Sequence, residues 1–152
     1  MADLKVGDTI PVFTAKDDEG TLITINPKEL SGPKVIYFYP KDDTPGCTKE
    51  ACSFRDSFEA FTDLQVEVIG ISSDSVDSHK NFKAKHRLPF TLLSDDTNAI
   101  RKQFGVKTNL FGLLPGRVTY VVSDKGTIQN MFSSQLNMEK HVTEALASLK
   151  KA

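Results

Sequence analysis

The chain has 152 residues, of which 39% are hydrophobic, and its 19 Lys and Arg residues nearly balance its 20 Asp and Glu residues for a formal net charge of -1. A chain of this length and composition fits one domain, residues 1–152, that buries about 68 to 70% of its unfolded surface. The charge balance offers no basic field for nucleic acid, and no stretch approaches the roughly 20 apolar residues of a membrane span, so neither partner is expected.

The first five residues contain no apolar signal-peptide segment, so a cytoplasmic location is expected. A plastid is the alternative, because a removed transit peptide would leave no trace. Two cysteines are too few for a disulfide scaffold, and a close pair in a reducing compartment more often serves catalysis or metal binding. A metal is disfavoured, because His79, His86 and His141 are far from the cysteines in sequence and no Cys-x2-Cys or His-Glu-x2-His spacing occurs.

Residues 1–33 predict a β-hairpin at an edge of a sheet. Ile10 and Val12 alternate with other residues before a turn signal at 17–20, and apolar residues return at 22, 23 and 25. The run Val35–Tyr39 is continuously apolar, which is typical of a central strand covered on both faces.

A turn and then a helix follow this strand, and both cysteines of the chain lie there, at Cys47 and Cys52. From residue 48 to about residue 62 the pattern predicts one amphipathic helix that docks on the sheet. Its apolar face carries three phenylalanines at helical spacing: Phe54, Phe58 and Phe61.

The middle of the chain alternates strands and helices. Residues 65–72 predict a buried strand, and residues 73–75 offer N-caps for a helix to about Arg87, on which His79 and His86 share a face that we expect to be exposed. Pro89 separates this helix from a strand at 90–93, and residues 95–97 cap a helix that Gly105 ends. The apolar loop 109–116 either packs under the sheet or forms an apolar rim beside a site.

The end of the chain predicts a hairpin, residues 118–122 and 127–132 around a turn at 123–126, and a helix from Asn137 to about Leu149. Arg117 stands at the mouth of the first of these strands, where sheet folds commonly place ligand groups. The order of elements predicts an α/β fold, a mixed central sheet with helices on both faces and an N-terminal β-hairpin.

The chemistry expected of Cys47 follows from its place in the first turn of a helix. Unpaired backbone N–H groups and the positive end of the helix dipole gather there, so a thiol loses its proton more easily, and the thiolate is the nucleophile. The dipole contributes about 1 to 2 kcal/mol at best, so a cation is needed as well. Lys49 is flexible whereas arginine is a rigid fork, so we expect an arginine from elsewhere in the chain.

The pattern Pro40-x3-Thr44-x2-Cys47 resembles the active-site motif of the peroxiredoxins, and Cys47-x4-Cys52 resembles their peroxiredoxin Q (bacterioferritin comigratory protein) subfamily. The resemblance extends along essentially the whole chain, through residues 71–74, 88–95 and 114–117. It implies a thioredoxin-like fold with peroxiredoxin insertions. It also implies a monomeric thiol peroxidase that reduces hydrogen peroxide and alkyl hydroperoxides without metal or organic cofactor.

The resemblance assigns roles to the matching positions. Cys47 would be the peroxidatic cysteine and Cys52 the resolving cysteine. Thr44 would hydrogen-bond the thiolate and the peroxide, and Pro40 would shield the site from water. Arg117 would be the missing cation.

The spacing of the two cysteines has a geometric consequence. Along an unbroken helix Cys47 and Cys52 would be about 8.6 Å apart at Cα, whereas a disulfide needs less than about 7 Å. We therefore predict that Cys47 becomes a sulfenic acid, that the helix start unwinds and that Cys52 then condenses with it. A thioredoxin or glutaredoxin-type dithiol would reduce the resulting disulfide.

Two other functions stay open at this point. A thioredoxin-like disulfide oxidoreductase would use the same fold, although the chain lacks its Cys-x2-Cys spacing. A non-catalytic binding or holdase module would use the loop 109–116 and would keep its activity after Cys47→Ser. Glu50 either orients Arg117 or is a solvated first-turn acid that favours the helix dipole.

Overall fold

In the part of the chain that the computed structural model describes, residues 4–106, 108–109, 114–134 and 137–151, seven strands form one sheet and two more form a short separate ribbon. The sheet contains β1 (Phe13–Asp17), β2 (Leu22–Ile25), β3 (Lys34–Phe38), β4 (Glu67–Ser72), β5 (Thr91–Ser94), β8 (Val118–Val122) and β9 (Ile128–Ser133). The ribbon is β6 (Thr108–Asn109) with β7 (Leu114–Pro115). The helices are α1 (Pro45–Asp56), α2 (Phe58–Asp63), α3 (Val76–His86), α4 (Ala99–Phe104) and α5 (Met138–Lys151).

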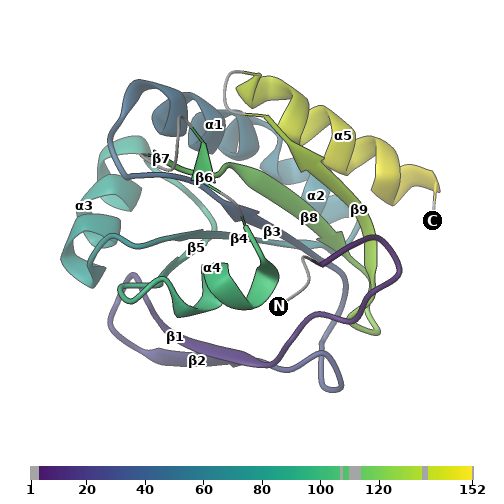
Figure 1. Ribbon diagram of the computed structural model, residues 1–152. Coiled ribbons are helices and arrows are strands. Elements are labelled where there is room, and N and C mark those ends of the chain that lie inside the picture. The colour runs from purple at the N-terminus through teal and green to yellow at the C-terminus, as the bar shows by residue number, and fades with distance from the viewer. Residues whose placement is uncertain (1–3, 107, 110–113, 135–136, 152) are drawn as a thin grey trace.

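The strand order is β2-β1-β5-β4-β3-β8-β9, with a hairpin at each end of the sheet (Figure 1). β3, β4 and β5 are parallel, whereas all other neighbours in the sheet are antiparallel. Parallel strands need crossover connections, and α1, α2 and α3 supply them here. The mixed sheet and the N-terminal hairpin predicted from the sequence are confirmed.

The two faces of the sheet carry separate cores. β3 alternates between them, because successive strand side chains point to opposite faces: Val35 and Tyr37 belong to one core, Ile36 and Phe38 to the other. The first, which we call the α1-side core, receives Phe54, Phe61, Phe82 and Val142 from α1, α2, α3 and α5. The second, the α4-side core, receives Ile100 and Phe104 from α4. Helices therefore cover both faces.

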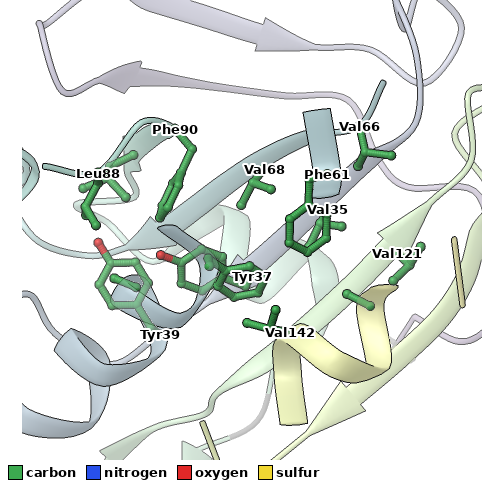
Figure 2. Packing of buried hydrophobic residues seen from close by; sticks show 14 of the residues in the cluster. Val35, Tyr37, Tyr39, Phe61, Val66, Val68, Leu88, Phe90, Val121 and Val142 are labelled. Carbon is green, nitrogen blue, oxygen red and sulfur yellow. The ribbon is translucent and has the colours of Figure 1, made fainter. Parts of the chain in front are cut away.

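The rings of Tyr37, Tyr39, Phe61 and Phe90 lie among valines in the α1-side core (Figure 2). Tyr37 stacks on Phe54 with 4.5 Å between ring centroids, and Tyr39 lies 5.4 Å from Tyr37. Such offset or tilted pairs add about 0.5 to 1.5 kcal/mol to the gain from burial. α1, which carries both cysteines, is thus held on a rigid aromatic layer.

The helix expected from residue 48 to residue 62 is in fact two helices. α1 ends at Asp56 and α2 begins at Phe58, because Ser57 between them has φ -102° and ψ 8°, outside the helical region. Phe54 and Phe61 are nevertheless fully buried and Phe58 packs against the same core, as expected for the phenylalanine face.

The other expected elements lie near their predicted positions. Gly105 ends α4 with a left-handed φ of 73°, as predicted. α4 begins later than expected, although the Asp95 carboxylate accepts hydrogen bonds from the backbone N–H groups of Ile100 and Arg101. Residues 110–113 of the apolar loop lie outside the described residues, so both expectations for that loop stay predictions. No helix in the described ranges has the length and apolar character to cross a membrane.

Candidate active site

Cys47 is the third residue of α1 and so lies in its first turn, as the sequence predicts. Thr44 is the N-cap residue with an extended backbone, Pro45 opens the helix, and the Thr48 N–H donates to the Thr44 carbonyl at 2.8 Å. Proline suits this first position because it has no N–H to leave unpaired. Cys47 is a free thiol that is only 1% exposed.

The two cysteines are on different sides of α1. Cys47 shares the buried face with Glu50, Ala51 and Phe54, at the i, i+3, i+4 and i+7 positions that face a core. Cys52 is off this face, partly exposed and also a free thiol. Because α1 is unbroken between them, a disulfide requires a rearrangement of the helix.

Arg117 approaches the start of α1 from the strand β8, which pairs with β3. It directly precedes β8, and the pairing of Phe38 with Val118 brings the end of β3 next to it. A Cβ atom at Gly46 would lie 3.1 Å from Arg117 Nη2 and 2.6 Å from Met138 Cε, so both side-chain ends pack closely over this glycine. Burial lowers the pKa of Arg117, but its interactions with Glu50 and Cys47 raise it by more.

Glu50 is the direct partner of Arg117. Arg117 Nη1 donates to Glu50 Oε1 at 2.7 Å, and both side chains are almost fully buried. Burial raises the pKa of Glu50 to about 7, against the opposing pull of Arg117. Among the described residues, Glu50 Oε2 and Arg117 Nε have no hydrogen-bond partner. The site therefore contains a buried acceptor and a buried donor that are both unused.

His141 of α5 lies behind Glu50. Its Nδ1 is 3.4 Å from Glu50 Oε2 and 2.7 Å from Thr119 Oγ1, and its Nε2 donates to the Ser134 carbonyl at 2.9 Å. Burial lowers the pKa of His141 to about 4, against the Ser134 hydrogen bond and with the help of the Arg117 charge. His141 is therefore neutral at pH 7 and adds no charge to the site.

Thr44 and Pro40 border the same helix start. The Thr44 hydroxyl donates to the Lys41 carbonyl at 2.9 Å, so in this state its oxygen can only accept a hydrogen bond from a further group. Pro40 follows β3 and is partly buried. All five site positions expected from the sequence are thus placed on α1, on the segment before it, or at the start of β8.

Arg101 is a site residue that the sequence analysis missed. Its guanidinium donates to the Gly116 carbonyl at 2.8 Å and to the Tyr39 carbonyl at 3.0 Å, and it is 5% exposed. These carbonyls directly precede Arg117 and Pro40, so one side chain ties together the two segments that carry the site. No local pattern marks this residue, because its partners are 15 and 62 positions away.

The histidine expected on an exposed face, His79, is fully buried, and that expectation is wrong. His79 Nδ1 is 2.7 Å from Asp42 Oδ2, and its Nε2 is 3.0 Å from the Leu93 carbonyl. Together with Asp74, these two residues are a group within the described ranges whose geometry could hold a metal ion. The hydrogen bonds described above join these side chains to other protein atoms. That the protein binds no metal stays a prediction.

Comparison with known proteins gives consistent relatives. A sequence model of the AhpC/TSA family matches residues 6–131. A chloroplastic peroxiredoxin Q of Sedum lineare is 51% identical over 149 residues, which are 98% of this chain and 80% of that protein. The chloroplastic peroxiredoxin Q of Arabidopsis thaliana is 50% identical over 152 residues, 100% of this chain and 70% of that protein.

Solved structures agree. Peroxidoxin BcpB from Mycobacterium tuberculosis superposes with a TM-score of 0.89 at 39% identity, and the match covers 97% of each chain. The bacterioferritin comigratory protein of Xanthomonas campestris, described for its alkyl peroxide reduction activity, gives 0.83 at 31% identity over 95% of this chain and 98% of that one. The thioredoxin-like fold with peroxiredoxin insertions is thereby confirmed.

The fold and these relatives define a thiol peroxidase, as the sequence predicts. The chain belongs to the AhpC/TSA family, and within it to the peroxiredoxin Q proteins.

Proposed function

We propose that this thiol peroxidase reduces hydrogen peroxide and alkyl hydroperoxides with Cys47 as the nucleophile. The thiolate attacks the outer oxygen of the peroxide, an S–O bond forms as the O–O bond breaks, and the sulfur is oxidised to a sulfenic acid. The other oxygen leaves as hydroxide or alkoxide and takes up a proton. The observation that carries this proposal is the buried Arg117 guanidinium, which is bound to Glu50 on the same buried face of α1 as Cys47 and has an unused Nε donor.

The neighbouring groups suit the charge that develops in this step. A guanidinium beside the thiolate stabilises the leaving oxygen, and fixed donors of this kind typically contribute a factor of about 10² to 10³ in rate. Thr44 Oγ1, whose proton goes to Lys41, would accept the hydrogen bond of the peroxide O–H. Pro40 would keep water from the attacked sulfur. The activity described for the Xanthomonas campestris relative supports alkyl hydroperoxides as substrates.

Glu50 would be the residue that orients Arg117. Its Oε1 accepts from Arg117 Nη1 at 2.7 Å, which leaves Nε and Nη2 of the guanidinium for the sulfur and the peroxide. This contact favours the orienting role over that of a solvated first-turn acid, since Glu50 is 0% exposed.

Cys52 would resolve the sulfenic acid. Its thiol attacks the oxidised sulfur, the S–S bond forms and water leaves, and a thioredoxin or glutaredoxin-type dithiol then reduces the disulfide. The step needs the first turns of α1 to unwind. Amides of residues 48–53 should therefore exchange faster in the oxidised protein, and unchanged exchange would contradict this cycle.

Two substitutions test the roles of the cysteines. Cys47→Ser should abolish peroxide consumption, whereas a binding or holdase function would survive it. Cys52→Ser should allow one fast turnover and then stop. A sustained thioredoxin-dependent rate in Cys52→Ser would contradict its resolving role, and insulin reduction by the wild type would favour a disulfide oxidoreductase.

The remaining expectations concern the whole chain. We propose one domain over residues 1–152, a monomer, and a cytoplasmic location. The names of the plant relatives support the plastid as the alternative. Sedimentation of the reduced protein and localisation of a tagged chain in its source cells test these points.

A further inference from the structure

The segment between β3 and α1 is tied to α3 by a buried hydrogen-bond cluster. Asp42, in the middle of this segment, is 6% exposed. Its carboxylate accepts from Tyr39 Oη at 2.5 Å and from Ser78 Oγ at 2.9 Å, and lies 2.7 Å from His79 Nδ1. Ser78 and His79 are consecutive on α3, so three side chains converge on one carboxylate.

The ring of His79 is held at both of its nitrogens. Nε2 donates to the Leu93 carbonyl at 3.0 Å, because a carbonyl oxygen can only accept. Nδ1 is hydrogen-bonded to Asp42 Oδ2 at 2.7 Å, and both side chains are buried. The imidazole is therefore fixed between the segment before α1 and the end of β5.

The backbone of the segment is held as well. The N–H of Asp42 donates to Asp74 Oδ2 at 2.8 Å, and that oxygen also accepts from Ser72 Oγ at 2.6 Å. Asp74 follows β4, an inner strand of the sheet. The residues just before α1 are therefore bonded to α3 and to the end of β4, independently of the helical hydrogen bonds of α1.

We propose that the buried Asp42–His79 hydrogen bond is an anchor that positions the segment Pro40–Thr44 against Cys47 and fixes the point at which unwinding of α1 stops. Asp42 and His79 are then positioning residues, since neither touches the peroxide. The inference rests on the proposed cycle of Cys47 and Cys52. In this view the helix unwinds on the far side of Thr44, while the peroxide-binding segment stays in place for the next turnover.

Two substitutions of His79 separate this role from simple packing. Asparagine places its amide donor near the position of Nδ1 and keeps the bond to Asp42, whereas glutamine places it near Nε2 and keeps only the bond to Leu93. Stopped-flow oxidation of Cys47 by hydrogen peroxide should slow by about 10- to 100-fold in His79→Gln, because small misplacements of reacting groups have effects of this size. In His79→Asn the rate should stay within about 3-fold of wild type.

Equal rates in the two variants, whether fast or slow, would overturn the proposal. Asp42→Ala, which removes the carboxylate bound by Tyr39, Ser78 and His79, should match His79→Gln and serves if that variant does not fold. Lys83→Met is the control, because it removes a different α3 contact, the ion pair to Asp18 at 3.2 Å, that does not touch this segment. It should leave the rate unchanged.

Hydrogen exchange tests where the unwinding of α1 stops. In the oxidised wild type the amide of Asp42 should stay protected while residues 48–53 lose protection, and in oxidised His79→Gln the loss should extend to residues 41–43. Loss of protection at Asp42 in the oxidised wild type would overturn the anchor. The proposed function and the anchor can fail separately. A Cys47→Ser variant that keeps peroxidase activity would refute the proposed function. An inactive Cys47→Ser variant together with a fully active His79→Gln variant would refute the anchor alone.

Discussion

A single buried ion pair, Arg117 with Glu50, sets the electrostatics beside Cys47. Breaking a buried pair by removing one partner typically costs about 3 to 5 kcal/mol, because the other charge is left without compensation. Here the stranded group has an alternative, since the pKa of Glu50 is already about 7. When Arg117 is lost, Glu50 should therefore take up a proton.

Arg117→Met tests this response. Arg117 lowers the pKa of Glu50 against the effect of burial, so its removal should raise that pKa further and leave Glu50 protonated at pH 7. Infrared spectroscopy should show a protonated carboxyl band that disappears in Arg117→Met with Glu50→Gln. The rate of Cys47 oxidation should fall by about 10² to 10³. A wild-type rate, or no such band, would contradict this account.

Arg101→Lys tests the residue that joins the two site segments. Different nitrogens of Arg101 bind the Tyr39 and Gly116 carbonyls, and a lysine ammonium cannot reproduce that fork. We expect Cys47 oxidation by peroxide to slow by roughly tenfold. Arg87→Lys, an exposed position at the end of α3, is the matched control. Equal rates in both variants would show that the fork does not position the site.

At the scale of elements, α5 covers the start of α1. The Met138 methyl group packs against Gly46, and Lys49 forms an exposed ion pair with Glu139 at 3.6 Å. Apolar packing at this junction should matter more than the exposed pair, since such pairs contribute about 0 to 1 kcal/mol.

Met138→Ala should therefore speed formation of the Cys47–Cys52 disulfide after oxidation, because the helix start loses its cover. Rapid quench with thiol alkylation measures this step. Glu139→Gln, one residue along, should leave the rate unchanged. A slower or unchanged rate in Met138→Ala would show that α5 does not restrain the helix start.

Most elements could be predicted from local patterns. The continuous run at 35–39 identified β3, and Gly105 identified the end of α4. The break at Ser57 could not be predicted, because the phenylalanine spacing continues across it and nearly the same rings are buried either way. Element identity follows from periodicity, whereas a change of helix direction depends on the surface on which the helices pack.

For the molecule as a whole, two buried groups act oppositely on stability. The pKa of Glu50 is raised from 4.5 to about 7, so its contribution is complete below about pH 4.5 and is lost as pH rises through 7. The pKa of His141 is lowered from 6.5 to about 4, so its contribution is present above about pH 6.5 and is lost as pH falls through 4. The two effects largely offset each other between pH 4.5 and 6.5.

The substitution His141→Asn removes the group with the lowered pKa and leaves only the effect of Glu50. The free energy of unfolding of the wild type, relative to the variant, should rise between pH 4 and 6.5 by up to about 3 kcal/mol and then level off. Urea denaturation at several pH values measures the difference. A difference that does not change over this range would show that His141 titrates normally in the native state.

The site was predictable to the extent that its residues belong to motifs that could be recognised. Cys47, Cys52, Thr44 and Pro40 are within 13 positions of one another, and Arg117 ends a second motif at 114–117. His79 was misjudged, because helical spacing shows which residues share a face but not which face is buried. Its partner Asp42 is 37 positions away, and only the assembled sheet brings them together.

The sheet between the two cores separates the reacting side of the molecule from the other. The proposed unwinding of α1 would disturb the α1-side core, whereas α4 and its apolar contacts lie on the opposite face of the sheet. Recovery after reduction would then be a short helix–coil relaxation on a preserved template, a process of about a microsecond for a short peptide. The encounter with peroxide and with the reductant, and not the refolding of α1, would then limit the rate of turnover.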